Sequence, residues 1–325
     1  MIKRWVIVGG CPRSGTTMLG NVLGAAPEAF VTPEAQFASE LLVQVQEGRI
    51  PATRDAIDGF IASHWRFKTW EMDYPADPWD DARAKTAEQL ASCAPRHIVA
   101  SYAALRGKPD PRVWIDQTPG HFTMLPTIEQ SDFDVSAVHI IRDGRGVAFS
   151  LAKVDWGPTH AAAVADWWAL QLAQAFAATS RTPCVNLTVR YEDLLTEPEA
   201  KLRLICDTIG LRFSEKMVAS QALAVPKYTQ SQNTALGKGV VATRGEAWRN
   251  ELMLREIEVF EHHAGKLLSI LGYPRLYIEP TLASFPQRAY ENFVFPSNQR
   301  CLQKQSTKKC LKSSIGVVPT ASAKS

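Results

Sequence analysis

The sequence lacks three features that would each point to a particular class of protein. Its six cysteines are widely separated, and none has the spacing of a metal-ligand or redox motif. No run of uninterrupted apolar residues is long enough to cross a bilayer. The formal net charge of +3 is too small to argue for a nucleic-acid partner, although it suits an anionic cofactor. We therefore expect reduced thiols, no bound metal, no nucleic-acid partner and no membrane span.

The N-terminus contains only a short apolar segment. Lys3 and Arg4 precede the apolar residues 5–8, as at the start of a signal peptide, but the glycines and proline of residues 9–12 end the run well short of a secretory core. With 46% hydrophobic and 21% charged residues, the composition is ordinary for a soluble globular enzyme. We therefore predict a cytoplasmic protein, and the sequence leaves a homo-oligomer open.

Apolar runs rich in β-branched residues alternate with helical patterns along the chain. We expect strands over residues 5–9, 112–115, 136–141 and 185–189, and helices over residues 16–26, 34–46, 144–153, 161–179, 198–209 and 250–271. This alternation predicts an α/β fold of three layers, with a mostly parallel central sheet flanked by helices. A single domain would cover residues 1–280, with a helical insertion at about 51–111. Residues 281–325, basic and without an acidic residue after Glu291, would form an extension that is mobile at its end; a polyanion- or membrane-binding role is the alternative.

The loop after the first predicted strand has the pattern of an anion site. It consists of Gly10, Cys11, Pro12, Arg13, Ser14, Gly15, Thr16 and Thr17. The glycines let backbone N–H groups turn inward, and the N-terminus of the next helix adds partial positive charge at the same point. The loop of nucleotide triphosphatases has a lysine where this sequence has Thr16. Triphosphate hydrolysis is therefore disfavoured, and a shorter phospho-anhydride end fits better.

A second anion-binding pattern follows the strand predicted over residues 136–141. Arg142 stands at the strand end, and Ser150 lies eight positions later on the next predicted helix. A guanidinium binds phosphate through two hydrogen bonds, and a hydroxyl near a helix start supplies a directed donor. Alone, this motif could be a surface turn with a helix cap. Together with the first loop, it predicts two anion sites on neighbouring strands, as a 3',5'-bisphosphate needs.

These two segments resemble the sulfotransferase superfamily, most closely its bacterial and tyrosylprotein-type branch. The resemblance covers about residues 5–275 and implies a P-loop-like fold that transfers a sulfuryl group from 3'-phosphoadenosine 5'-phosphosulfate without a metal. It implies that the first loop holds the 5'-phosphosulfate and that Arg142 and Ser150 hold the 3'-phosphate. Two further matches are Tyr191, which would lie near the adenine, and Arg244, which would close over the cofactor.

The resemblance also implies catalytic residues. Glu34 follows the loop by about the interval at which the tyrosylprotein-type branch has its glutamate, so it is the candidate general base at a helix start. The alternative is that an acidic residue simply favours the first helical turn. His121 is the reserve base because histidine titrates near neutrality, although a structural role is its alternative. Arg13 would stabilise the leaving phosphate, and Gln117 stands where many relatives have a lysine, so it offers a hydrogen bond but no charge there.

Two other functions remain open at this point. A P-loop kinase or nucleotidase would require a metal. A cofactor-binding homologue with impaired turnover is suggested by Gln117. For the enzyme, we expect a carbohydrate or small-molecule acceptor, since a cytoplasmic protein would seldom meet secretory tyrosines. The nearby Trp65, Trp70 and Trp79 either line the acceptor site or pack in the core.

Overall fold

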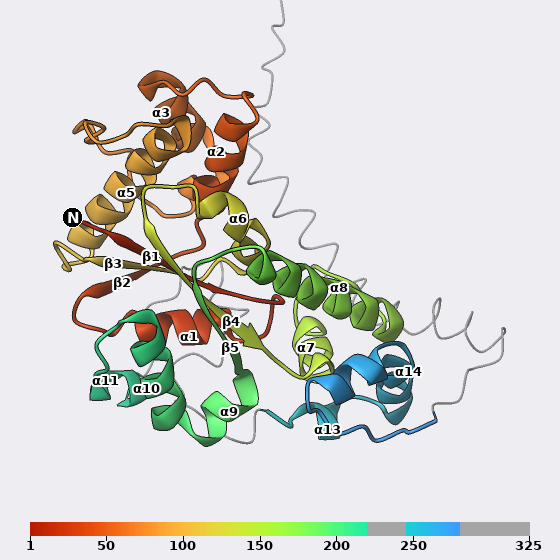
Figure 1. The fold of residues 1–325 in the computed structure, drawn as a ribbon. Coiled ribbons are helices and arrows are strands. Elements are labelled where there is room, and N and C mark those ends of the chain that lie inside the picture. The colour runs from red at the N-terminus through yellow and green to blue at the C-terminus, as the bar shows by residue number, and fades with distance from the viewer. Residues whose placement is uncertain (220–244, 280–325) are drawn as a thin grey trace, which may run out of the picture. The chain divides into compact units, whose positions relative to one another are not determined.

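The structure is a computed structural model that describes residues 1–219 and 245–279 (Figure 1). The described residues group into two compact units. The first comprises residues 1–142, 170–219 and 245–246, and the second comprises residues 143–169 and 247–279. The single domain over residues 1–280 stays a prediction, and both Arg244 and the extension over residues 281–325 lie outside the described residues.

A parallel sheet forms the centre of the first unit (Figure 1). In chain order, its strands within the described residues are β1 Arg4–Gly9, β2 Ala29–Thr32, β3 Val113–Asp116, β4 Asp134–Ile141 and β5 Val185–Arg190. Their order across the sheet is β2-β3-β1-β4-β5, and each neighbouring pair is parallel. The central strand β1 is an almost continuous buried apolar run, because a parallel sheet is covered on both faces. The predicted α/β fold is confirmed.

Helices cover both faces of this sheet. On one face, Val6 and Val8 of β1 pack in a core with residues of α1 Thr16–Leu23, α9 Tyr191–Thr196, α10 Pro198–Ile209 and α11 Glu215–Ala219. On the other face, Trp5 and Ile7 pack in a core with residues of α2 Gln36–Gln46, α5 Ala87–Leu105, the 3₁₀ helix η1 Pro119–Met124 and α6 Leu125–Ile128. Successive residues of β1 serve opposite cores because side chains alternate along a strand. This gives the three predicted layers.

The predicted insertion at residues 51–111 is largely helical. It contains α3 Arg54–Ser63, the one-turn helix α4 Trp65–Lys68 and α5. Trp70 and Trp79 are almost fully buried in the core, whereas Trp65 is 59% exposed. The core interpretation is therefore correct for two of the three tryptophans, and only Trp65 remains on the surface.

The second unit is helical in its described part. It contains α7 Gly144–Leu151, residues 161–169 of α8 Ala161–Ser180, α13 Trp248–Glu251 and α14 Leu254–Ile270. Asp143 caps α7, since its Oδ1 accepts the backbone N–H of Arg145 at 2.9 Å. Across the described residues of both units, no helix combines the length and apolar character that a membrane span requires.

His139 on β4 is a buried histidine within aromatic surroundings. Its ring centre lies 4.7 Å from that of Phe122 and 5.0 Å from that of Phe176. Neither ring nitrogen has a hydrogen-bond partner among the described residues. Burial lowers the pKa of His139 to about 4 because the charged ring would lose its hydration.

We expect His139→Phe to reduce the acid sensitivity of folding. The native pKa is below the ordinary value, so under about pH 6.5 the unfolded chain binds a proton that the folded chain does not. As the pH falls from about 6.5 to 4, this residue should therefore lower the free energy of unfolding of the wild type by up to about 3 kcal/mol. Urea unfolding across this pH range measures the free energy of unfolding of both proteins. The same pH dependence in the wild type and in His139→Phe would contradict the expectation.

Candidate active site

Most of the predicted site residues follow the carboxyl ends of the parallel strands. All five strands end at the same edge of the sheet, and ligands of open α/β sheets bind beyond that edge. Along the chain, the predicted site residues follow these strands one by one: Arg13 follows β1, Glu34 follows β2, Gln117 and His121 follow β3, Arg142 follows β4 and Tyr191 follows β5. The topology thus gathers side chains that lie far apart in the sequence.

The loop between β1 and α1 packs tightly against its surroundings. Gly10 and Gly15 have φ angles of 145° and 101°, which favour glycine. A Cβ on Gly10 would lie 2.3 Å from the carbonyl oxygen of Ile140, and one on Gly15 would lie 2.7 Å from the ring of Tyr191. The backbone of Arg13 also lies in the left-handed region, with a φ of 73°, which is rare for a residue with a side chain. This backbone is therefore held in one shape by its neighbours.

The same loop offers hydrogen-bond donors. The side chain of Ser14 is fully buried, and its Oγ has no hydrogen-bond partner among the described residues. Helix α1 begins at Thr16 with Gly15 as its N-cap, so no N-cap side chain accepts a hydrogen bond from the backbone N–H groups of its first turn. A helix N-terminus carries partial positive charge. The buried hydroxyl and the uncapped helix together fit a bound anion.

Two guanidinium groups meet at this loop. Nη1 of Arg142 donates to the carbonyl oxygen of Arg13 at 2.9 Å, and the Arg142 guanidinium lies 4.5 Å from the centre of the Tyr191 ring. Burial and the positive charge of Arg142 lower the pKa of Arg13, while the charge of Glu34 opposes this. Like charges in a partly buried site repel, so an anion beside them would be stabilised.

Tyr191 begins α9 and packs beneath both arginine-bearing segments. It is almost fully buried in the first unit, between Gly15 and Arg142. The structure therefore gives it a supporting position under the loop. Its contact with an adenine ring stays a prediction.

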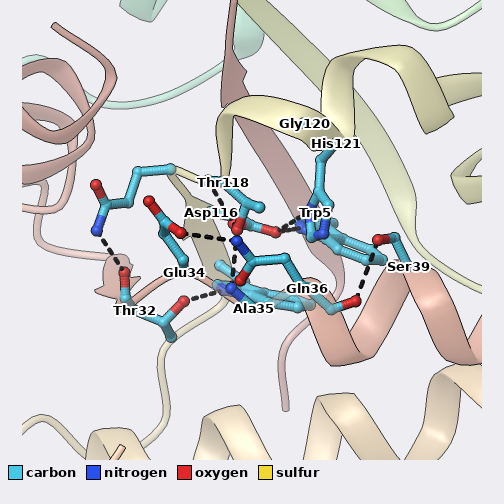
Figure 2. A network of polar contacts seen from close by, with 12 residues as sticks. Trp5, Thr32, Glu34, Ala35, Gln36, Ser39, Asp116, Thr118, Gly120 and His121 are labelled. Atoms are coloured by element: carbon cyan, nitrogen blue, oxygen red, sulfur yellow. Dashed lines mark hydrogen bonds and ion pairs between the residues drawn. The ribbon is translucent and has the colours of Figure 1, made fainter. Parts of the chain in front are cut away.

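Glu34 lies ahead of α2 and outside its first turn. Helix α2 begins at Gln36, and no acidic residue stands in its first turn. The predicted helix start at Glu34 is therefore wrong by two residues, and the helix-dipole explanation loses its basis. Oε2 of Glu34 accepts a hydrogen bond from Nε2 of Gln36 at 2.7 Å and pairs with Nη2 of Arg66 at 2.9 Å (Figure 2 shows the Gln36 contact). Its charge also acts on Arg13 in the loop.

Gln117 is buried at the end of β3. Its Nε2 donates to the carbonyl oxygen of Thr32 at 3.3 Å, and its Oε1 has no partner among the described residues. Helix α1 approaches it closely at Gly20, where a Cβ would lie 2.8 Å from the Cβ of Gln117. The side chain thus lies between α1 and the end of β2. A role toward the leaving group stays a prediction.

His121 belongs to a buried network centred on Asp116 (Figure 2). Oδ2 of Asp116 lies 2.6 Å from Nδ1 of His121 and accepts the indole N–H of Trp5 at 3.1 Å. Oδ1 of Asp116 accepts from the N–H and hydroxyl of Thr118, whose Oγ1 accepts the N–H of Ala35 at 2.8 Å. The network therefore ties the end of β3 to the residue after Glu34. It favours the structural alternative for His121, and the reserve catalytic role stays a prediction.

The comparisons with known proteins decide the family. A family model described as the sulfotransferase family matches residues 6–215. The chain belongs to the sulfotransferase family. It is 22% identical over 303 residues to a Caenorhabditis briggsae protein named "Putative protein-tyrosine sulfotransferase", with 90% of this chain and 96% of that protein covered. Among solved structures, it resembles the sulfotransferase domain from the curacin biosynthetic pathway, with a TM-score of 0.53 at 14% identity, over 85% of this chain and 99% of that one.

This sulfotransferase is therefore an enzyme, and the kinase-like alternative loses its support. Ser150 lies on α7 in the second unit, while Arg142 ends the first, so their joint grip on a phosphate stays a prediction. Among the described residues, no group of three or more His, Cys, Asp or Glu side chains is arranged around a metal position. Sequence reasoning missed Asp116, Thr118 and Arg66, which carry no local motif.

Proposed function

We propose that this sulfotransferase moves a sulfuryl group from 3'-phosphoadenosine 5'-phosphosulfate to a hydroxyl or amine by in-line transfer. The main support is the pair Arg13 and Arg142 beside an uncapped helix N-terminus and the buried Ser14 hydroxyl. Such a site favours a ligand with several negative charges. A donor with phosphates at both its 5' and 3' positions has that character.

The residues predicted to bind the phosphates and to act in the reaction then each have a role. The residues that would hold the 5'-phosphosulfate are Arg13, Ser14, Gly15, Thr16 and Thr17, and those for the 3'-phosphate are Arg142 and Ser150. The donor supplies the activated sulfuryl group. Arg13 would stabilise charge on the leaving phosphate, and Glu34 would take the proton of the acceptor. Most of the rate would come from positioning and electrostatic stabilisation.

The acceptor is proposed to be a carbohydrate or small molecule. A tyrosyl hydroxyl is the second candidate, because the C. briggsae relative is named for that activity. A sugar or phenol ring could stack on the exposed indole of Trp65, because the other two tryptophans of the insertion are buried. A screen with labelled donor against glycosides, simple phenols and a tyrosine peptide distinguishes these acceptors. Turnover in this screen also decides against a homologue with impaired activity.

We expect 3'-phosphoadenosine 5'-phosphate to bind without metal and Arg142→Ala to weaken this binding by roughly 10- to 100-fold. The reason is that hydrogen bonds to charged groups contribute about 1.5–3 kcal/mol. Calorimetric titration measures the affinity, with ATP and magnesium as the competing ligand. Arg49→Ala, in a surface pair with Glu47, is the control and should bind as the wild type does. Absent binding, or a preference for ATP with magnesium, would contradict the proposed donor.

A further inference from the structure

A short helix of the insertion is tied to the segment that carries Glu34. Nη2 of Arg66 on α4 lies 2.9 Å from Oε2 of Glu34. Just after α4, the indole N–H of Trp70 donates to the carbonyl oxygen of Glu34 at 3.0 Å. Just before it, Nε2 of His64 lies 3.0 Å from Oε2 of Glu40 on α2. These three contacts place α4 beside the candidate base.

Arg66 is itself held in a defined position. Its side chain is only 11% exposed, and its guanidinium lies 4.1 Å from the centre of the Trp65 ring, a cation–π contact. Its backbone N–H donates to Nδ1 of His64, which caps α4. Because Nδ1 accepts, the proton of neutral His64 lies on Nε2 and is donated to Glu40. Backbone and side-chain contacts together direct Arg66 toward Glu34.

The hydrogen bond and the ion pair that the Glu34 carboxylate makes in the described part of the chain involve the same oxygen. Gln36 donates to Oε2 at 2.7 Å, and Arg66 pairs with the same Oε2. Within the described residues, Oε1 receives no hydrogen bond, and the side chain keeps 27% of its surface exposed. A carboxylate fixed through one oxygen presents the other in a defined direction. General bases depend on such alignment with the proton that they remove.

We propose that Arg66, seated on Trp65 and assisted by Gln36, is a positioning residue that holds Oε2 of Glu34 and aims Oε1 at the acceptor. This inference rests on the proposed function, since it needs Glu34 as the base. In the step, the acceptor oxygen forms a bond to sulfur as its proton passes to Oε1. The bond between sulfur and the bridging phosphate oxygen breaks, and the phosphate leaves with that electron pair.

Arg54 provides a matched control within the same insertion. It pairs with Asp81 at 3.0 Å and lies 4.1 Å from the centre of the Trp79 ring, so it has the same two kinds of contact as Arg66 but with Asp81 in place of Glu34. We expect Arg66→Ala to lower kcat by roughly 10- to 100-fold with the donor KM within about twofold. Arg66→Lys should recover most of the loss, and Arg54→Ala should keep kcat within about twofold. Equal losses in Arg66→Ala and Arg54→Ala would overturn the inference.

A double variant separates positioning from a general loss of structure. If Arg66 acts through Glu34, then Arg66→Ala in the Glu34→Gln background should change kcat by less than about twofold. A further loss as large as that in the wild-type background would mean that Arg66 acts independently of Glu34. That result would overturn the inference even if the proposed reaction stands.

A measurement without turnover keeps the two proposals distinguishable. The ¹³C signal of the Glu34 carboxyl, assigned through Glu34→Gln, should shift in Arg66→Ala and stay in place in Arg54→Ala. An unchanged signal in Arg66→Ala would overturn the contact itself. Failure of the wild type to bind 3'-phosphoadenosine 5'-phosphate would instead overturn the proposed function. Transfer by Arg66→Ala at the wild-type rate would overturn only the positioning role.

Discussion

Glu34→Gln is expected to lower kcat by roughly 10²- to 10⁴-fold, the usual contribution of a positioned general base. Glutamine has nearly the same shape, and its amide oxygen can still accept the hydrogen bond from Gln36 and lie beside the Arg66 guanidinium, so the local structure should survive. The amide cannot take a proton from the acceptor. Because the negative charge of Glu34 acts on Arg13, its removal should leave the affinity for 3'-phosphoadenosine 5'-phosphate unchanged or slightly higher.

Steady-state kinetics with the acceptor from the screen measures this effect, and calorimetry measures the affinity. Glu47→Gln is the control, since it makes the same change at the exposed C-terminal end of α2. It should keep kcat within about twofold, because a surface pair contributes little. Full activity in Glu34→Gln would show that another group takes the proton, and His121 would become the first candidate despite its buried bond to Asp116.

The parallel sheet was predictable because four of its strands are apolar, β-branched runs between turn residues. The strand β2 was not predicted, since its four residues Ala29–Thr32 lie between two prolines and are too short for a period to emerge. It is a strand because it pairs with β3 along its whole length. The helix expected over residues 250–271 is divided, because Leu252 is extended and Glu256 accepts the N–H of Met253 at the start of α14.

The candidate site divides in the same way. The loop glycines and Arg142 carry a local signal, since each lies between a strand end and a helix start that follow one another in the sequence. Arg66 carries none, because its contact with Glu34 joins two segments brought together only by the fold. Arg145 has no role in the sequence-based prediction, although it lies between Arg142 and Ser150. The structure instead shows it buried as the centre of an ion network in the second unit.

The guanidinium of Arg145 is surrounded by acceptors. It donates to both carboxylate oxygens of Asp143 at 2.9 and 2.6 Å, to Oε1 of Glu261 at 2.5 Å and to the carbonyl oxygen of Pro274 at 2.9 Å. The Trp248 ring covers it at 4.0 Å. Burial alone would lower the pKa of Arg145, but the two carboxylates raise it. The residue is therefore a buried cation whose charge is balanced by fixed partners.

We expect Arg145→Met to destabilise the second unit by about 3–5 kcal/mol, the cost of breaking a buried ion pair by removing one partner. The substitution leaves the carboxylates of Asp143 and Glu261 buried without their cation. Glu261 cannot turn away freely, because it also accepts the backbone N–H groups of Leu276 and Tyr277. Hydrogen exchange at the amides of α7 and α14 reports this unit separately from the sheet.

The double variant Arg145→Met/Glu261→Met tests whether charge is the cause. The double variant leaves only Asp143 without its cation, whereas Arg145→Met leaves both Asp143 and Glu261 unpaired, so the double variant should lose less stability than the sum of the single variants. Asp143 would still cap α7 through its bond to the backbone of residue 145. Additive losses would instead point to packing around Trp248. Helix α7 carries Ser150, so weaker cofactor binding in an Arg145 variant would be caused by unfolding of α7. In Arg142→Ala, weaker binding would be caused by the loss of a proposed cofactor-binding side chain.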